Sequence, residues 1–158
     1  MIFVTVGSQK FQFNRLLKAI DRLVEEGIIN EKVFAQTGYS DYQPKHYDTK
    51  AFLDRDEIAQ VVEDADIIIT HGGTGSIISA VKKEKMVIAV PRKAEFGEHV
   101  DDHQYQIIEQ FTEMNLILSC DDMNELTEVL KDVRVQQFNK YRSNTEKIIE
   151  NIEKFILA

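Results

Sequence analysis

The chain has 158 residues, of which 43% are apolar and 29% are charged, and its formal net charge is −8. This length and composition are typical of one globular domain and argue against a disordered chain, a disulfide scaffold or a fibre. The negative charge repels phosphate backbones, so nucleic acid is not an expected partner, and an anionic ligand would have to be held by local groups.

Targeting signals and the single cysteine bear on location. The apolar run at residues 2–6 is too short for a signal peptide and lacks a basic lead, and no stretch is long enough to cross a bilayer. Cys120 has no partner for an internal disulfide, which fits a reducing compartment. We therefore expect a cytoplasmic protein that reaches a membrane only through another molecule.

Strand and helix patterns alternate along the chain. Short apolar runs predict strands, and apolar residues at helical spacing predict helices between them. The predicted strands cover residues 1–6, 32–36, 50–53, 66–70, 86–90 and 115–119. The predicted helices cover residues around 16–24, 56–64, 76–83, 105–111 and 126–130, and Asp121 or Asp122 is expected to cap the last of these.

The final predicted element is a helix over about residues 136–156. Its apolar residues form one stripe, which packs on the domain's own sheet, on a partner, or on a second copy in a homodimer. The strands at 66–70 and 86–90 are nearly continuous apolar runs, as in strands buried on both faces of a parallel sheet. The sequence thus predicts an α/β fold, a doubly wound parallel sheet in a single domain over residues 1–158.

Three polar turns follow predicted strands, where ligands of an open parallel sheet bind. The first turn consists of Gly7, Ser8 and Gln9. The second consists of His71, Gly72, Gly73, Thr74, Gly75 and Ser76. The third covers residues 91–104.

The second turn is the most informative of the three. Its glycines let the backbone approach a ligand, and the following helix offers free N–H groups and the positive end of its dipole, which suits a diphosphate. The turn lacks the lysine of a P-loop, and Ile78 stands where the dinucleotide fingerprint has its third glycine. ATP hydrolysis and NAD chemistry are therefore less favoured, and a purely structural glycine turn is the alternative.

The third turn carries groups that can bind sugar hydroxyls. These groups belong to Glu98, His99, Asp102, His103 and Gln104. The two histidines and Asp102 could ligate a metal if they were helical, but no further ligand set is visible, so no metal is expected. A solvated acidic helix cap is the other alternative.

Taken together, these motifs resemble the C-terminal domain of family 28 glycosyltransferases, and most closely the PssE-type subunits of bacterial exopolysaccharide synthesis. The resemblance covers nearly the whole chain. It is carried by residues 1–7, 65–66, 71–76, 90–92 and 97–104. It implies a Rossmann-like half of a GT-B glycosyltransferase that binds a UDP-sugar and needs no cofactor.

The resemblance also implies roles for the turns. Gly7, Ser8 and the second turn would cradle phosphate, while Glu98, Asp102, His103 and Gln104 would contact hydroxyls. A separate, membrane-associated partner would bind a lipid-linked saccharide acceptor, to which a hexose is transferred with inversion. The catalytic base is left open: it lies on the partner or is one of three residues, His71, His99 or Asp102.

Two departures from the family pattern stand out. A single-chain relative places a ribose-binding carboxylate where this chain has Ser79, and the family often shows glycine where this chain has Glu84. The sequence leaves two other functions open: a non-catalytic nucleotide-sugar binder that activates a partner, and a small UDP-sugar epimerase.

Overall fold

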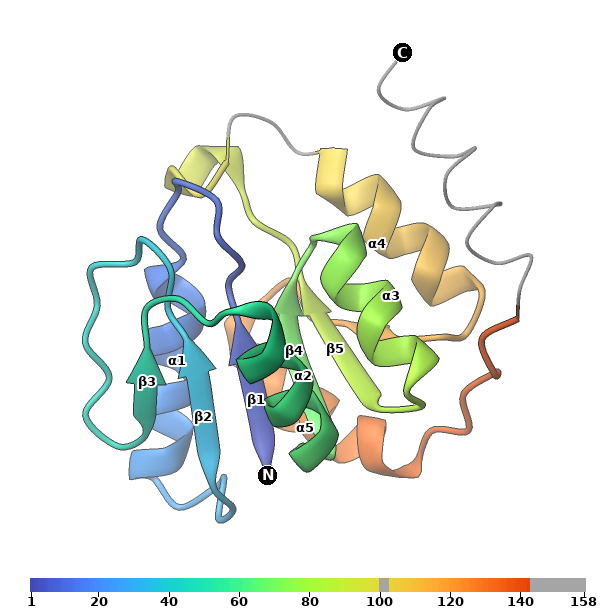
Figure 1. Cartoon of the computed structure of the whole chain (residues 1–158), viewed down its shortest axis with the longest axis horizontal. Helices are drawn as coiled ribbons and strands as arrows, with labels where there is room; N and C mark the ends of the chain where they lie inside the picture. The colour runs from blue at the N-terminus through green and yellow to red at the C-terminus, as the bar shows by residue number, and fades with distance from the viewer. Residues whose placement is uncertain (100–102, 143–158) are drawn as a thin grey trace.

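The structure, a computed structural model, describes residues 1–99 and 103–142, except for the side chain of His103 (Figure 1). Six strands and five α-helices alternate through this part of the chain. The strands are β1 (Ile2–Thr5), β2 (Val33–Gln36), β3 (Asp48–Lys50), β4 (Ile67–His71), β5 (Met86–Val90) and β6 (Leu118–Ser119). The helices are α1 (Asn14–Glu25), α2 (Arg55–Asp64), α3 (Thr74–Lys82), α4 (His103–Glu113) and α5 (Leu126–Val135), with 3-10 turns η1 (Ala94–Phe96) and η2 (Met123–Glu125).

All six strands lie in one parallel sheet, in the order β3-β2-β1-β4-β5-β6. The chain adds strands outward from β1 to one edge, then returns to the centre and adds β4, β5 and β6 on the other side. This confirms the predicted doubly wound sheet. Its topological switch point lies between β1 and β4, where Val4 pairs with Ala35 on one side and Ile69 on the other.

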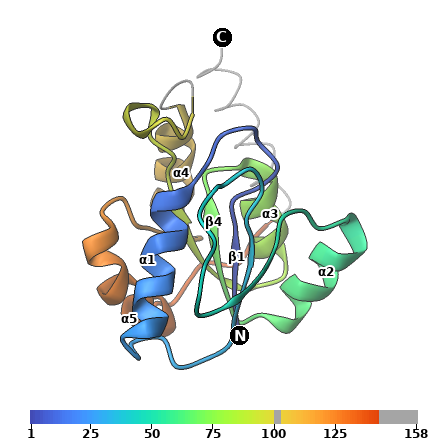
Figure 2. The same ribbon diagram turned by 90° about the vertical axis from the view of Figure 1, so that its left-hand side faces the viewer.

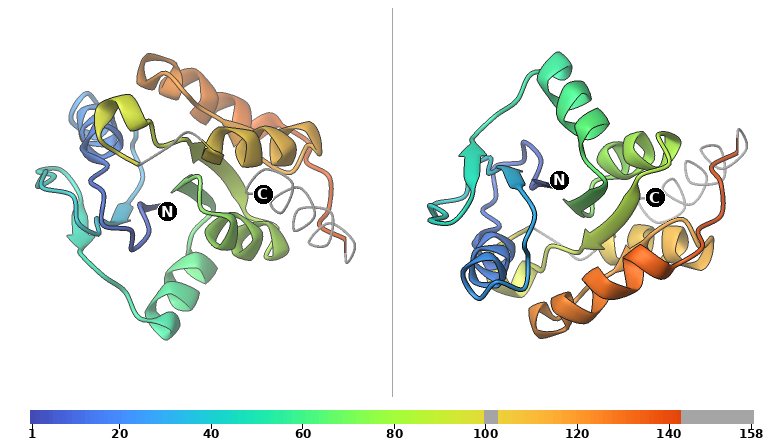
Figure 3. Two further views of the ribbon diagram at one scale, coloured as in Figure 1. Left: turned by 90° about the horizontal axis from the view of Figure 1, so that it is seen from above. Right: turned by 90° about the horizontal axis from the view of Figure 1, so that it is seen from below.

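Helices cover both faces of the sheet, with α1 and α5 on one face and α2 and α3 on the other (Figures 2 and 3). Alternate strand residues point to opposite faces, so each face has its own apolar cluster. Leu16, Leu17 and Ile20 of α1 are fully buried in the first cluster. Ile108 and Phe111 of α4 belong to the second, together with α2 and α3.

Local sequence signals explain several boundaries. The α2 helix begins with a capping box, in which the Asp54 carboxylate accepts a hydrogen bond from the Glu57 amide at 2.8 Å. The Asp122 carboxylate accepts from the Asn124 amide at 2.9 Å and so caps the 3-10 turn η2. The helix α5 itself begins after Glu125 without a side-chain cap, so the prediction that Asp121 or Asp122 caps this helix is wrong.

Two strands differ from their predicted ranges. β3 covers Asp48–Lys50, not residues 50–53, because this edge strand is set by backbone pairing to β2 and not by apolar side chains. β6 is confined to Leu118–Ser119 because Asn115 takes a left-handed φ of 56°, which turns the chain at the end of α4. Residues 116–117 are buried in the core without strand pairing.

The predicted final helix does not begin at residue 136. Gln136 takes an extended conformation after α5, and residues 136–142 are not helical. This segment is held by Asn115, whose side-chain amide donates to the Gln137 carbonyl at 2.8 Å and whose carbonyl accepts from the Asn139 amide at 2.9 Å. The rest of the predicted helix lies outside the described residues. Within the described part, no helix is long and apolar enough to cross a membrane.

Candidate functional site

The first two turns follow β1 and β4, which are neighbours in the sheet (Figure 1). At the carboxyl end of these strands, both turns approach the ring of His71. Gly7 has a φ of 72°, and a Cβ added there would lie 2.5 Å from Nε2 of His71. A Cβ added at Gly73 would lie 2.5 Å from Cε1 of the same ring. Both positions therefore need glycine, because the imidazole fills the space between the two turns.

Burial makes His71 a neutral residue. The side chain is 4% exposed, and burial lowers its pKa to about 3, with the nearby charges of Arg92 and His99 acting in the same direction. The ring is therefore uncharged at neutral pH. It can donate or accept a hydrogen bond there, but it does not contribute a positive charge.

Several buried polar atoms at this edge of the sheet have no hydrogen-bond partner. Within the described part of the chain they are Oε1 of Gln9, Oγ1 of Thr70, Nδ1 of His71, Nε of Arg92 and Oε1 of Gln104. A sixth such atom, Oε1 of Glu31, lies elsewhere, 3.4 Å from the N-terminal ammonium group. Because buried polar groups in folded proteins are nearly always paired, this concentration indicates a place that a ligand or water completes.

The second turn presents a free helix N-terminus. Gly73 is the N-cap of α3, and no side chain caps the helix there. A Cβ added at Gly75 would meet nothing within 4 Å, so this side-chain position on the first turn of α3 is open. The N–H groups at the start of α3 and the positive end of its dipole lie beside the two hydroxyl side chains of Thr74 and Ser76.

A crevice of about 210 Å³ opens at the switch point, between the sheet and the helices α2 and α3. It combines an apolar floor with a polar rim. The floor includes Phe3, Leu53, Ile58 and Ile68. The rim includes Gly7, Ser8, Gln36, Ser76 and Ser79. A crevice that is apolar inside and polar at its mouth fits a flat heterocycle carried on a sugar phosphate.

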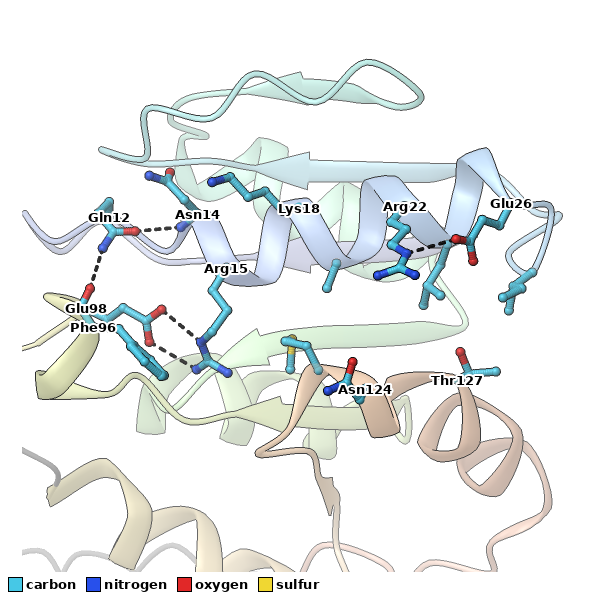
Figure 4. A pocket seen from close by; sticks show the side chains of 14 residues that line it. Gln12, Asn14, Arg15, Lys18, Arg22, Glu26, Phe96, Glu98, Asn124 and Thr127 are labelled. Carbon is cyan, nitrogen blue, oxygen red and sulfur yellow. Dashed lines mark hydrogen bonds and ion pairs between the residues drawn. The ribbon is translucent and has the colours of Figure 1, made fainter.

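The third turn is divided between two places. The Glu98 carboxylate, which is 1% exposed, accepts two hydrogen bonds of 3.1 Å from Arg15 on α1 and one of 2.9 Å from the Lys93 amide (Figure 4). It faces a larger hollow of about 690 Å³ along α1, which shares no residue with the crevice. This geometry disfavours the expected contact between Glu98 and a sugar hydroxyl.

Two other residues of the third turn lie nearer to the second turn and to the loop after β1. Gln104 packs against the second turn, since a Cβ added at Gly72 would lie 2.7 Å from its Cβ. The His99 ring lies 5.6 Å from the ring of Phe11 in the loop after β1. Asp102 and the side chain of His103 lie outside the described part of the structure. Over residues 1–99 and 104–142, no three acidic, histidine or cysteine side chains converge as a metal site would require.

Arg92 was not among the predicted site residues, and it is a fully buried charged side chain at this edge. It is 0% exposed, and its guanidinium donates to main-chain carbonyls of the first and third turns. The resemblance included Arg92 in a motif, but no sequence pattern shows that a side chain will bond to carbonyls about eighty residues away.

A doubly wound parallel sheet with its topological switch point between β1 and β4 defines the class of Rossmann-like α/β domains. Within that class, the chain belongs to the glycosyltransferase family 28 C-terminal domain family, which it matches over residues 1–156.

A relative of this chain is also a glycosyltransferase subunit. The chain is 37% identical over 65 residues to the UDP-N-acetylglucosamine transferase subunit ALG13 of Candida albicans. The match covers 41% of this chain and 21% of the length of that relative.

Solved structures support the fold alone, because the identities are low. A solution structure of ALG13 is similar with a TM-score of 0.64 at 18% identity, covering 96% of this chain and 93% of that one. A crystal structure of the kitacinnamycin glycosyltransferase gives 0.62 at 13% identity, covering 99% of this chain and 39% of that one. The chain has the Rossmann-like fold of one half of such GT-B enzymes.

Proposed function

We propose that this chain is the donor-binding half of a two-component glycosyltransferase, which binds a UDP-sugar at the switch point and acts with a partner subunit. The observation that carries the proposal is the free N-terminus of α3 beside the turn at Gly7, with the neutral ring of His71 between them. A diphosphate at this position would accept hydrogen bonds from α3 amides and from the hydroxyls of Ser8 and Ser76. The net charge of the chain makes such local donors necessary.

The crevice next to this anion site is the proposed pocket for the base and ribose. Its apolar floor suits the faces of uracil, and Ser79 at its rim is within the part of α3 where the family resemblance implies ribose recognition. Ribose binding here would use neutral hydroxyl and amide groups. The proposed ribose site leaves out the Glu98 carboxylate, because it accepts hydrogen bonds from Arg15 and Lys93 and lines the hollow along α1, not the crevice.

The proposals for the partner, acceptor and location rest on the family and on the sequence resemblance. The Candida albicans relative is a UDP-N-acetylglucosamine transferase subunit, which supports a UDP-sugar donor and dependence on a second subunit. The PssE-type resemblance supports a membrane-associated partner, a lipid-linked saccharide acceptor and a role in exopolysaccharide or capsule synthesis. We accordingly propose transfer of a hexose, with N-acetylglucosamine as the first donor sugar to test, by a cytoplasmic chain recruited to the membrane by its partner.

The catalytic contribution of this half would be stabilisation of the leaving diphosphate. Preorganised N–H groups that face developing negative charge often account for a large part of an enzyme's rate enhancement. His71 is neutral and enclosed, which suits hydrogen bonding to phosphate better than proton abstraction from an acceptor on another subunit. Of the candidates for the base, this leaves the partner, His99 and Asp102.

The test uses Gly75, whose side-chain position points into open space. Gly75→Asp places a carboxylate at the start of α3, where it stabilises the helix dipole but repels a diphosphate. Gly75→Ala is the matched control, because it changes helix propensity without charge. We expect UDP and UDP-N-acetylglucosamine, but not GDP-sugars, NAD or ATP, to bind the wild-type chain in calorimetry, and Gly75→Asp to weaken UDP binding at least about tenfold relative to Gly75→Ala.

Equal UDP affinities in the two variants would contradict a phosphate site at α3. Turnover assays with the partner then separate the remaining functions. Binding without turnover in the complex indicates a non-catalytic activator, and a changed sugar nucleotide without acceptor indicates an epimerase.

A further inference from the structure

The side chain of Arg92 is a fully buried cation whose hydrogen bonds go to main-chain carbonyls. Its guanidinium donates to the carbonyls of Phe11 at 3.0 Å, Gln12 at 3.2 Å and Glu98 at 3.0 Å, and also to the carbonyl of Val6. It also lies over the ring of Phe13, 5.0 Å from the centroid. A buried charge is costly unless it is hydrogen-bonded, so this set of acceptors defines one position for the side chain.

Three of these four carbonyls belong to the loop that follows β1. They flank Gly7, Ser8 and Gln9, the residues of the first turn. No backbone–backbone hydrogen bond within the described structure involves residues 8–12. Arg92 is therefore a main source of order in this loop. It binds carbonyls only, so it leaves the amides of Ser8 and Gln9 available for a ligand, whereas the Gly7 amide already donates to Oγ1 of Thr5 at 3.2 Å.

A second set of contacts, made by Arg15 of α1, holds the loop after β5. The Arg15 guanidinium binds both oxygens of Glu98 and donates to the carbonyls of Pro91 and Asp121, each at 3.0 Å (Figure 4). The segment after β1 is thus joined to the loop after β5 by two arginines: Arg92 from that loop and Arg15 from α1. Figure 4 also shows Gln12 donating to the Phe96 carbonyl, a further link between them.

We propose that Arg92 is a positioning residue for the phosphates of the donor: it holds the first turn in the shape that presents its amides to the diphosphate, without touching the ligand. This inference rests on the proposed function, because it concerns the same site. It predicts that loss of Arg92 weakens recognition of phosphate more than recognition of the nucleoside.

The test compares UDP with uridine as probes of the intact chain. We expect Arg92→Met to weaken UDP binding about tenfold or more, and to change uridine binding much less. Arg92→Lys keeps the charge but cannot reach all four carbonyls, so it should recover part of the UDP affinity. Affinities are measured by calorimetry for UDP and by NMR titration for uridine, and amide shifts of residues 7–12 report the loop directly.

Leu130→Ala is the control for a general loss of stability, because Leu130 is 7% exposed in the core and lies on α5. It should lower Tm without changing the ratio of UDP to uridine affinity. Unchanged UDP binding in Arg92→Met would overturn the inference, and so would an equal loss for UDP and uridine. If Arg92→Met does not fold, an unchanged affinity ratio in Arg92→Lys overturns it. A wild-type chain that binds neither probe would instead refute the proposed function itself.

Discussion

At the scale of single residues, backbone conformation explains one departure from the family pattern. Glu84 has a φ of 57°, in the left-handed region that favours glycine, and its amide donates to the Val81 carbonyl at 3.0 Å. The chain thus keeps the helix end that glycine makes in relatives, at the cost of some strain in Glu84.

Glu84→Gly is therefore expected to stabilise the protein. The gain in the free energy of unfolding should be about 0.5–1 kcal/mol, because glycine removes the left-handed penalty but is more flexible when unfolded. Glu63→Gly, in the helix α2, is the matched control and should destabilise by a similar amount. Urea denaturation of both variants checks the prediction, and a loss of stability in Glu84→Gly would contradict it.

At the scale of elements, one buried carboxylate attaches the loop between β2 and β3 to α1. Asp21 is 2% exposed and accepts hydrogen bonds from the Tyr42 hydroxyl at 2.6 Å and the amides of Lys45 and His46 at 3.0 and 2.9 Å. Burial raises its pKa, but these hydrogen bonds outweigh burial and leave the pKa below its ordinary value. The carboxylate is therefore charged at neutral pH.

Asp21→Asn should cost about 2 kcal/mol of stability, because an amide cannot accept all of these hydrogen bonds and its own N–H groups face other donors. Tyr42→Phe removes a single bond and should cost about 1 kcal/mol. Urea denaturation of both variants and of the double variant measures the coupling. A change below about 0.5 kcal/mol in Asp21→Asn would show that the attachment is unimportant.

At the scale of the whole molecule, the buried imidazole of His71 makes stability depend on pH. Its folded-state pKa is about 3 and its ordinary value is 6.5, so the unfolded chain binds more protons between these values. The free energy of unfolding must therefore fall as the pH drops below about 6.5, by up to about 1.4 kcal/mol per unit.

Between pH 7 and pH 5, wild-type protein should lose about 2 kcal/mol more stability than His71→Asn, which has no proton to bind in this range. Asp21 does not interfere, because its depressed pKa acts only at lower pH. Urea titrations at the two pH values make the comparison. Parallel losses in both proteins would mean that His71 is not protected from protons in the folded state.

The sequence predicts which segments form much of the candidate site, but it does not predict which side chains contact one another there. Glycines after strands placed the first two turns correctly at the carboxyl edge, and the structure brings Gly7, Gly73 and His71 together there. The partner of Glu98 could not be predicted, since Arg15 lies 83 residues away on another element. Nothing local distinguishes a carboxylate that binds a sugar from one that binds an arginine.

The sequence by itself determined the alternation of strands and helices, the parallel sheet and the position of the glycine turns, because hydrophobic periodicity and turn chemistry are local properties. Only the tertiary structure decided the short ranges of β3 and β6, the extended course of residues 136–142, the neutral state of His71 and the place of Arg92. These features depend on burial and on hydrogen bonds between segments far apart in the chain. Such contacts exist only once the sheet has brought those segments together.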